Sequence, residues 1–173
     1  MSTVESRAKV LGHPIHQMLI VVPLGMFVGA IVFDALFYFN GRSPRWADIS
    51  YWMIVTGLVG GVLAAVPGWI DWFGIPTGTR AKALGLWHGL GNGIGVLGLF
   101  GASWWLRRPD PTNPPDLALL LSLLGFLAGG VTAWLGGELV DRLGIGVDPG
   151  ANPNAPSSLS GKPAGHVPAQ PRS

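Results

Sequence analysis

Three of the four histidines lie in or beside long apolar stretches of the 173-residue chain, where they could support chemistry. His13 and His16 are three residues apart, so on a helix they would share one face and could ligate one metal ion. His88 is followed one helical turn later by Asn92, and an ionisable group inside an apolar span needs a partner. Such imidazoles serve as haem ligands, as metal ligands or as proton acceptors beside a quinone.

Two acidic residues, Asp71 and Glu138, are expected at the same end of the molecule as these histidines. In a first predicted site, His16 and His88 ligate a b-type haem. Its neighbouring partners would be Asn92, Asp71 and Glu138. In a second predicted site, a divalent metal is held by three imidazoles and two carboxylates: His13, His16, His88, Asp71 and Glu138. In a third interpretation the histidines only hydrogen-bond to helix carbonyls or carboxylates, and the protein is a structural or assembly subunit without chemistry.

The elements that must position these residues are four apolar stretches of about 24–26 residues, each long enough to cross a bilayer as a helix. They cover residues 14–39, 49–73, 81–106 and 116–140, and the short loops between them favour antiparallel neighbours. Charged residues make up 12% of the chain, about half the share in soluble domains. The sequence therefore predicts an all-α fold, an integral membrane four-helix bundle over residues 14–143 after a short segment 1–13. Residues 144–173 are expected to form a disordered polar tail.

A repeated motif relates the two halves of this bundle. The segment Arg7–Gly12 before the first helix recurs as Arg80–Gly85 before the third, with five of six residues identical at an offset of 73. We interpret the chain as two duplicated helical hairpins related by a pseudo-two-fold axis along the membrane normal. His16 and His88 then occupy nearly equivalent positions, with a mismatch of one residue, or about 100° around a helix.

Four spans place both termini on one side of the membrane, here called the N side. Five basic residues flank the N side and four flank the other, which favours cytoplasmic termini. Asp34 is expected to pair with Arg45 or Arg107 near the opposite interface. The alternative is a proton path from Asp34 through Asn92 to His88. Small residues at four-residue spacing in the later helices predict close helix packing.

The composition also limits cofactors and partners. The chain has no cysteine, so thiolate ligands are excluded, and it has no basic block of the kind that binds nucleic acid. The lipid bilayer is the expected environment, and a redox partner, a quinone and a second copy of the chain are the candidate partners. No hydrolase or NTPase motif is present, and the sequence leaves open whether the protein is an enzyme.

Four motifs together resemble the bacterial membrane family catalogued as domain of unknown function 2231. They are Gly12–Gly25, Val66–Trp72, Thr79–Lys82 with Leu86–Asn92, and Gly136–Val140. The resemblance implies four-helix proteins of the bacterial inner membrane without an established activity. Some members are fused to Rieske iron–sulfur or cytochrome c modules, which implies electron transfer near a quinone pool; this chain carries no such module. The resemblance places five candidate residues in the family's recurrent motifs: His13, His16, Asp71, His88 and Glu138.

Overall fold

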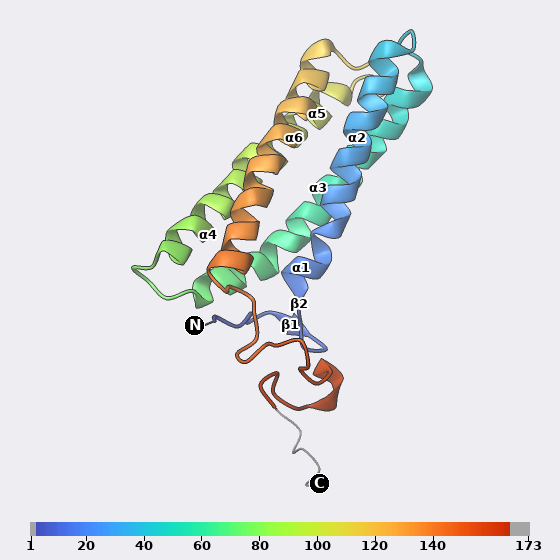
Figure 1. Cartoon of the computed structure of the whole chain (residues 1–173). Helices are drawn as coiled ribbons and strands as arrows, with labels where there is room; N and C mark the ends of the chain where they lie inside the picture. Colours follow the sequence, from blue (N-terminus) through green and yellow to red (C-terminus); the bar gives the residue numbers. More distant parts are fainter. Residues whose placement is uncertain (1–2, 167–173) are drawn as a thin grey trace.

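The computed structural model describes residues 3–166, which form four long helical spans and a small cap at the N side (Figure 1). The first span consists of α1 (Ile15–Leu19) and α2 (Val21–Phe39), and the second is α3 (Pro44–Gly74). The third consists of α4 (Arg80–Leu90), the π-helical segment η1 (Gly91–Leu97) and α5 (Gly98–Arg107). The fourth consists of α6 (Asp116–Gly137) and the π-helical turn η2 (Glu138–Arg142). A short antiparallel pair, β1 (Lys9–Val10) and β2 (His13–Pro14), precedes α1, and a 3₁₀ turn η3 (Ser158–Ser160) follows the bundle.

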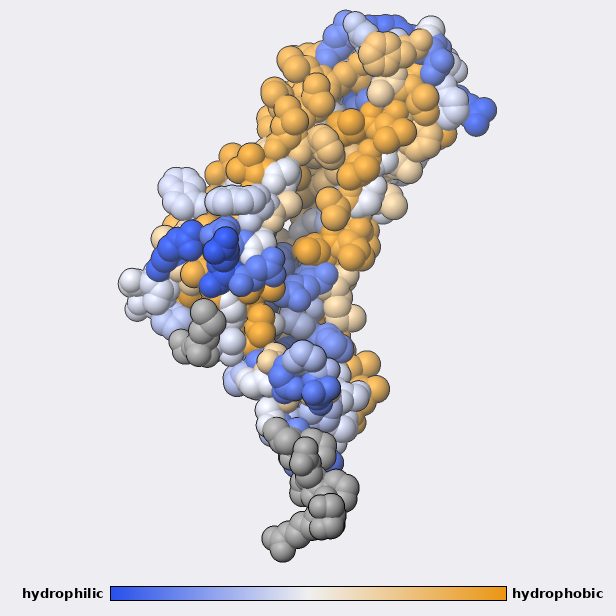
Figure 2. Space-filling model, viewed as in Figure 1, coloured by the Kyte–Doolittle hydropathy of each residue, from blue (hydrophilic) through white to orange (hydrophobic). Residues whose placement is uncertain are grey.

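These spans confirm the predicted all-α four-helix bundle. Each is long and apolar enough to cross a membrane. Large apolar side chains such as Val62, Leu63 and Val66 point outward, and apolar residues cover much of the visible surface of the bundle (Figure 2). A lipid environment accommodates such a surface, and the helices satisfy their own backbone hydrogen bonds there. Both ends of the described chain lie on the N side (Figure 1).

Two helix boundaries differ from the predicted ones. The second span begins at Pro44 rather than at residue 49, because proline suits a first helical position and the charged residues Arg45 and Asp48 interrupt the apolar pattern but not the helix. The first span is interrupted at Ile20. Pro23 has no N–H to donate to the carbonyl of Leu19 four residues earlier, which accounts for this break.

The described part of the tail makes contacts with the N-terminal segment, and the disorder expected for residues 144–173 stays a prediction. Ile145 forms a parallel bridge with Val4, and the backbone N–H of Gly146 donates to the carbonyl oxygen of Val4 at 2.7 Å. Lys9 forms an ion pair with Asp148. Together these segments cap the N side of the bundle (Figure 1). The rest of the predicted tail, residues 167–173, lies outside the described residues.

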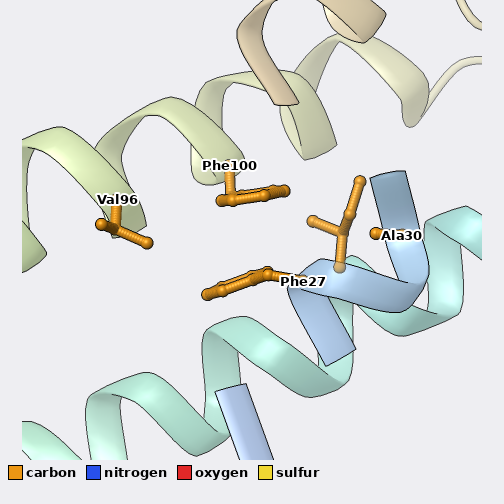
Figure 3. Close-up of a cluster of buried hydrophobic side chains, with 5 residues drawn as sticks. Phe27, Ala30, Val96 and Phe100 are labelled. Carbon is orange, nitrogen blue, oxygen red and sulfur yellow. The ribbon is translucent and has the colours of Figure 1, made fainter. Parts of the chain in front are cut away.

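Equivalent residues of the two hairpins meet at the centre of the bundle. Phe27 of α2 stacks on Phe100 of α5, with ring centroids 4.0 Å apart and planes 11° apart (Figure 3). Each ring lies over a glycine of the second helix of its own hairpin, Gly57 or Gly125, where a Cβ would come within 3.0 Å of the ring. The same Phe-over-Gly contact in both hairpins supports their origin by duplication. This core also includes Ala30, Ile54 and Val96.

A buried ion pair closes the bundle at the end opposite the N side. Arg107 of α5 donates from Nη1 to Oδ1 of Asp34 at 2.9 Å and from Nη2 to Oδ2 at 2.7 Å. Arg107 is fully buried and Asp34 is 6% exposed. Three buried serines complete the hydrogen bonding of the pair: Ser50, Ser103 and Ser122. The predicted pairing of Asp34 with Arg107 is confirmed.

Candidate functional site

His16 of α1 and His88 of α4 face each other across the axis of the bundle. Their ring centroids are 6.2 Å apart and the ring planes are nearly perpendicular, at 86°. Both side chains are only half-buried. The two hairpins also touch on the N side, where Trp69 and Trp72 of α3 lie against Gly89 and Gly85 of α4. The space-filling view shows a cleft between them (Figure 2). The histidine pair therefore joins the two hairpins in the N-side half of the bundle.

Each imidazole is fixed by a backbone carbonyl from the second helix of its own hairpin. Nδ1 of His16 lies 2.8 Å from the carbonyl oxygen of Ala64 in α3, and Nδ1 of His88 lies 2.9 Å from that of Thr132 in α6. Because a carbonyl oxygen only accepts hydrogen bonds, these contacts assign the proton to Nδ1 in both rings. In this tautomer the lone pair of each ring lies on Nε2, the atom that can bind a metal or accept a proton.

A glycine beside each carbonyl makes room for the ring. Gly68 follows Ala64 by one helical turn, and Gly136 follows Thr132 by the same spacing. A Cβ at Gly68 would lie 2.9 Å from Nδ1 of His16, and a Cβ at Gly136 would lie 3.2 Å from Cε1 of His88. A larger residue at either position would push the imidazole away from its carbonyl. These glycines are thus part of the site, besides serving helix packing.

Asn92 links His88 to the neighbouring helix. Its Oδ1 accepts a hydrogen bond from Oγ1 of Thr132 at 2.9 Å, and its Nδ2 donates to the carbonyl oxygen of His88 at 3.0 Å. The same Nδ2 lies 3.3 Å from Nε2 of His88, a longer contact. Asn92 therefore keeps two good partners if Nε2 of His88 binds something else. It lies in η1, and such π-helical segments are frequent at functional sites.

The structure places His13 away from the pair. His13 lies in β2, before the helix begins at Ile15, so the predicted shared helix face of His13 and His16 is wrong. The chain turns at Leu11 and Gly12, which have positive φ values of 50° and 82°. Pro14 is extended, with ψ 121°, and His13 before it pairs with Val10 in the short hairpin, so the helix does not extend back to His13. The exposed His13 ring contacts Ser158 of the tail, with 3.4 Å between Nε2 and Oγ.

The two acidic candidates are held by the repeated motif. Asp71 accepts hydrogen bonds from the backbone N–H groups of Arg7 and Ala8 at 2.7 and 3.0 Å. Glu138 forms an ion pair with Arg80 at 2.9 Å. In each hairpin, the acidic residue at the end of the second helix thus binds the copy of the repeated motif that lies at the start of the first helix. Within residues 3–166 there is no group of three or more His, Asp or Glu side chains arranged to hold a metal ion.

An apolar layer separates the histidine pair from the buried ion pair. The stacked rings of Phe27 and Phe100, together with Ala30 and Ile54, fill the axis between them (Figure 3). No described polar side chain bridges this layer, and both Asp34 oxygens are engaged by Arg107. The structure therefore does not support the proton path suggested from Asp34 to His88.

Residues 12–149 match the family described as "Predicted membrane protein (DUF2231)". The chain belongs to this family. No curated protein and no solved structure matches the chain. The DUF2231 match covers all four spans and every candidate site residue, and the chain is accordingly a multi-pass membrane protein with four candidate spans.

Two groups that build the site of this DUF2231 protein were not predicted from the sequence. Ala64 and Thr132 contribute through their backbone carbonyls. Every residue has a backbone carbonyl, so the residue type does not reveal which one accepts the hydrogen bond. Gly68 and Gly136 are visible as glycines four positions after these residues, but the same spacing is typical of helix packing in general. Aligning the two halves on the histidines, at an offset of 72, does not pair these glycines either, because Gly136 follows Gly68 by only 68 positions.

Proposed function

We propose that this DUF2231 protein binds a b-type haem between His16 and His88 and serves as an electron-transfer subunit of the bacterial plasma membrane. The observation that carries the proposal is the pair of facing imidazoles on diagonal helices of a bundle. Two imidazoles bound on opposite sides of one metal, with metal–nitrogen distances of about 2.0–2.1 Å, place their ring centroids about 6.4 Å apart. The separation of 6.2 Å is close to this value.

The surroundings of the rings also fit axial ligands. Metal-ligating histidines usually donate their other ring N–H to a carbonyl or carboxylate, which fixes the tautomer and the ring orientation. His16 and His88 both do so, through Ala64 and Thr132. A bound haem supplies one-electron chemistry, while the chain's own residues hold the ring planes and shield the far side with the stacked phenylalanines. Such a haem would exchange electrons with a quinone or a redox partner.

The variants His16→Ala and His88→Ala test this proposal. Full-length protein expressed in haem-replete cells is expected to give a reduced-minus-oxidised spectrum of a low-spin b-type haem. Each of the two variants is expected to lose this low-spin spectrum, because one axial ligand is missing. His13→Ala is the matched control and should keep the spectrum, since His13 lies in β2 against the tail. A colourless wild-type protein, or an unchanged spectrum in His88→Ala, would rule the proposal out.

A structural or assembly subunit without chemistry is the second candidate, and one observation favours it. Within the described residues, every buried side-chain nitrogen or oxygen has a hydrogen-bond partner. The histidines would then only lock the helices of each hairpin together. This candidate predicts that His88→Ala lowers stability while wild-type and variant protein are equally colourless. A divalent-metal site with five ligands is less favoured, because His13, Asp71 and Glu138 would have to leave their present partners.

We further propose that the N side faces the cytoplasm. Five basic residues flank it: Arg7, Lys9, Arg80, Lys82 and Arg142. On the opposite side Arg107 is buried in the ion pair with Asp34, so the flanking charges there are only Arg42, Arg45 and Arg108. The excess of flanking positive charge is typical of a cytoplasmic side.

In this cysteine-free chain, Ser43→Cys should react with a membrane-impermeant maleimide added to intact cells, and Ser160→Cys should not. The reverse labelling pattern would invert the orientation.

A further inference from the structure

Three pairs of residues meet across the axis between the two hairpins, and each pair joins equivalent positions. His88 follows His16 by 72 positions, Phe100 follows Phe27 by 73, and Arg107 follows Asp34 by 73. The π-helical segment η1 lies between His88 and Phe100 and adds one residue to the third span, which accounts for the change in offset. The first two pairs join identical residue types, whereas the third joins opposite charges.

The opposite charges at the third position restrict which hairpins can pair with each other. The His and Phe pairs would form equally well between two copies of the first hairpin, since each Phe ring lies over a glycine of its own hairpin. At the third position the same pairing would place Asp34 beside a second Asp34. Two copies of the second hairpin would likewise place Arg107 beside a second Arg107. Like charges in a water-free interior are strongly unfavourable.

We propose that Asp34 and Arg107 determine hairpin pairing. They make the inner face of the first hairpin (residues 15–74) accept the second hairpin (residues 80–142) and reject another copy of itself. The chain therefore closes on its own second half instead of exchanging hairpins with a neighbouring molecule in the membrane. A buried polar pair that fixes registry and partner is an established use of such groups.

The serines around the ion pair are compatible with charges of either sign. The hydroxyl of Ser50 donates to Oδ1 of Asp34 at 2.5 Å, and the hydroxyl of Ser122 accepts from Nη2 of Arg107 at 3.1 Å. A hydroxyl both donates and accepts, so it can serve a carboxylate or a guanidinium. The proposal therefore predicts that the two charges can be exchanged between hairpins without changing which hairpins pair.

A single introduced cysteine can report the pairing in the full-length chain, which has no cysteine of its own. Phe27→Cys places a thiol on the axis, where it faces Phe100 in the closed chain and its own counterpart only when two first hairpins meet. Gly25→Cys is the matched control, because a Cβ at Gly25 has no neighbour within 4 Å and reports random collisions in the membrane. The readout is the fraction of disulfide-linked dimer after oxidation in membranes.

With Asp34 and Arg107 present, Phe27→Cys is expected to give no more dimer than the Gly25→Cys control. Asp34→Leu with Arg107→Met replaces both charges by apolar side chains and is expected to raise the Phe27→Cys dimer about tenfold, the level expected when hairpins pair without preference. Asp34→Arg with Arg107→Asp restores opposite charges and should return the dimer to the control level.

Either of two results would overturn the proposal. One is an apolar double variant that folds and stays at the control level of dimer. The other is an exchanged-charge variant that dimerises as much as the apolar one, or that unfolds like Asp34→Arg alone. The single variant Asp34→Arg places two arginines together and is expected to reduce the folded-to-unfolded ratio by about 100-fold or more. The comparison of exchanged and single variants remains decisive even if the apolar variant does not fold.

Discussion

Arg107→Ala is expected to lower the free energy of unfolding by about 3–5 kcal/mol, the cost of leaving a buried charge without its partner. Arg107 makes both of its strongest hydrogen bonds to Asp34, and the guanidinium is fully buried. After its removal the Asp34 carboxylate keeps only the hydroxyl of Ser50 as a donor. The measurement is reversible unfolding of the full-length protein in mixed detergent micelles.

Arg108→Ala is the control for the Arg107 prediction. Arg108 is the next residue, but it is exposed and lies over the ring of Trp105, 4.6 Å from the ring centroid. An exposed cation–π contact contributes about 0.5–1 kcal/mol, so the control should cost much less than the test variant. Equal losses in the two variants would show that the Asp34–Arg107 pair does not stabilise the bundle in the way described here.

Gly136→Val is expected to weaken haem binding by about 10–100-fold, the usual cost of disturbing a group that orients a metal ligand. A Cβ at this position already lies 3.2 Å from Cε1 of His88, and the two methyl groups of valine would extend further. The ring would have to leave the carbonyl oxygen of Thr132, which fixes its tautomer and orientation. The measurement is a haem titration of protein produced without the cofactor.

Gly137→Val provides a control in the adjacent residue. A Cβ at Gly137 has no neighbour within 4 Å, so valine there fits without displacing His88. Both variants change a glycine of α6 to the same residue, and general effects on the helix therefore cancel in the comparison. Equal affinities in the two variants would contradict the role assigned to Gly136.

The sequence predicted the fold because lipid imposes a simple rule on it. Four continuous apolar stretches can only be helices, and their length fixes the number of spans. Asp34 could be assigned to Arg107 for a similar reason, since a carboxylate deep in a span needs a nearby cation. The start of α3 at Pro44 was missed because interfacial charges such as Arg45 belong to the helix although they break the apolar pattern.

The candidate site was only partly predictable. The pairing of His16 with His88 followed from the repeat, but a mismatch of one residue stood against a symmetric arrangement. In the structure the motif before His16 is a turn and a short strand, whereas its copy before His88 opens a helix, so the two spacings are not comparable. His13 was grouped with His16 by helical spacing, but Pro14 between them is extended and His13 pairs with Val10 in the short hairpin. Contacts to backbone carbonyls decide the site, and they depend on packing rather than on residue type.

The histidine pair is the central claim, and electron paramagnetic resonance of the oxidised full-length protein tests it most directly. Axial imidazole planes held nearly perpendicular, at the 86° found for His16 and His88, leave two iron orbitals close in energy and give a strongly anisotropic low-spin ferric signal. The expected result is this signal in the wild-type protein and its loss in both His16→Ala and His88→Ala. A wild-type protein with only a high-spin ferric signal, or with no haem signal after expression in haem-replete cells, would contradict the claim.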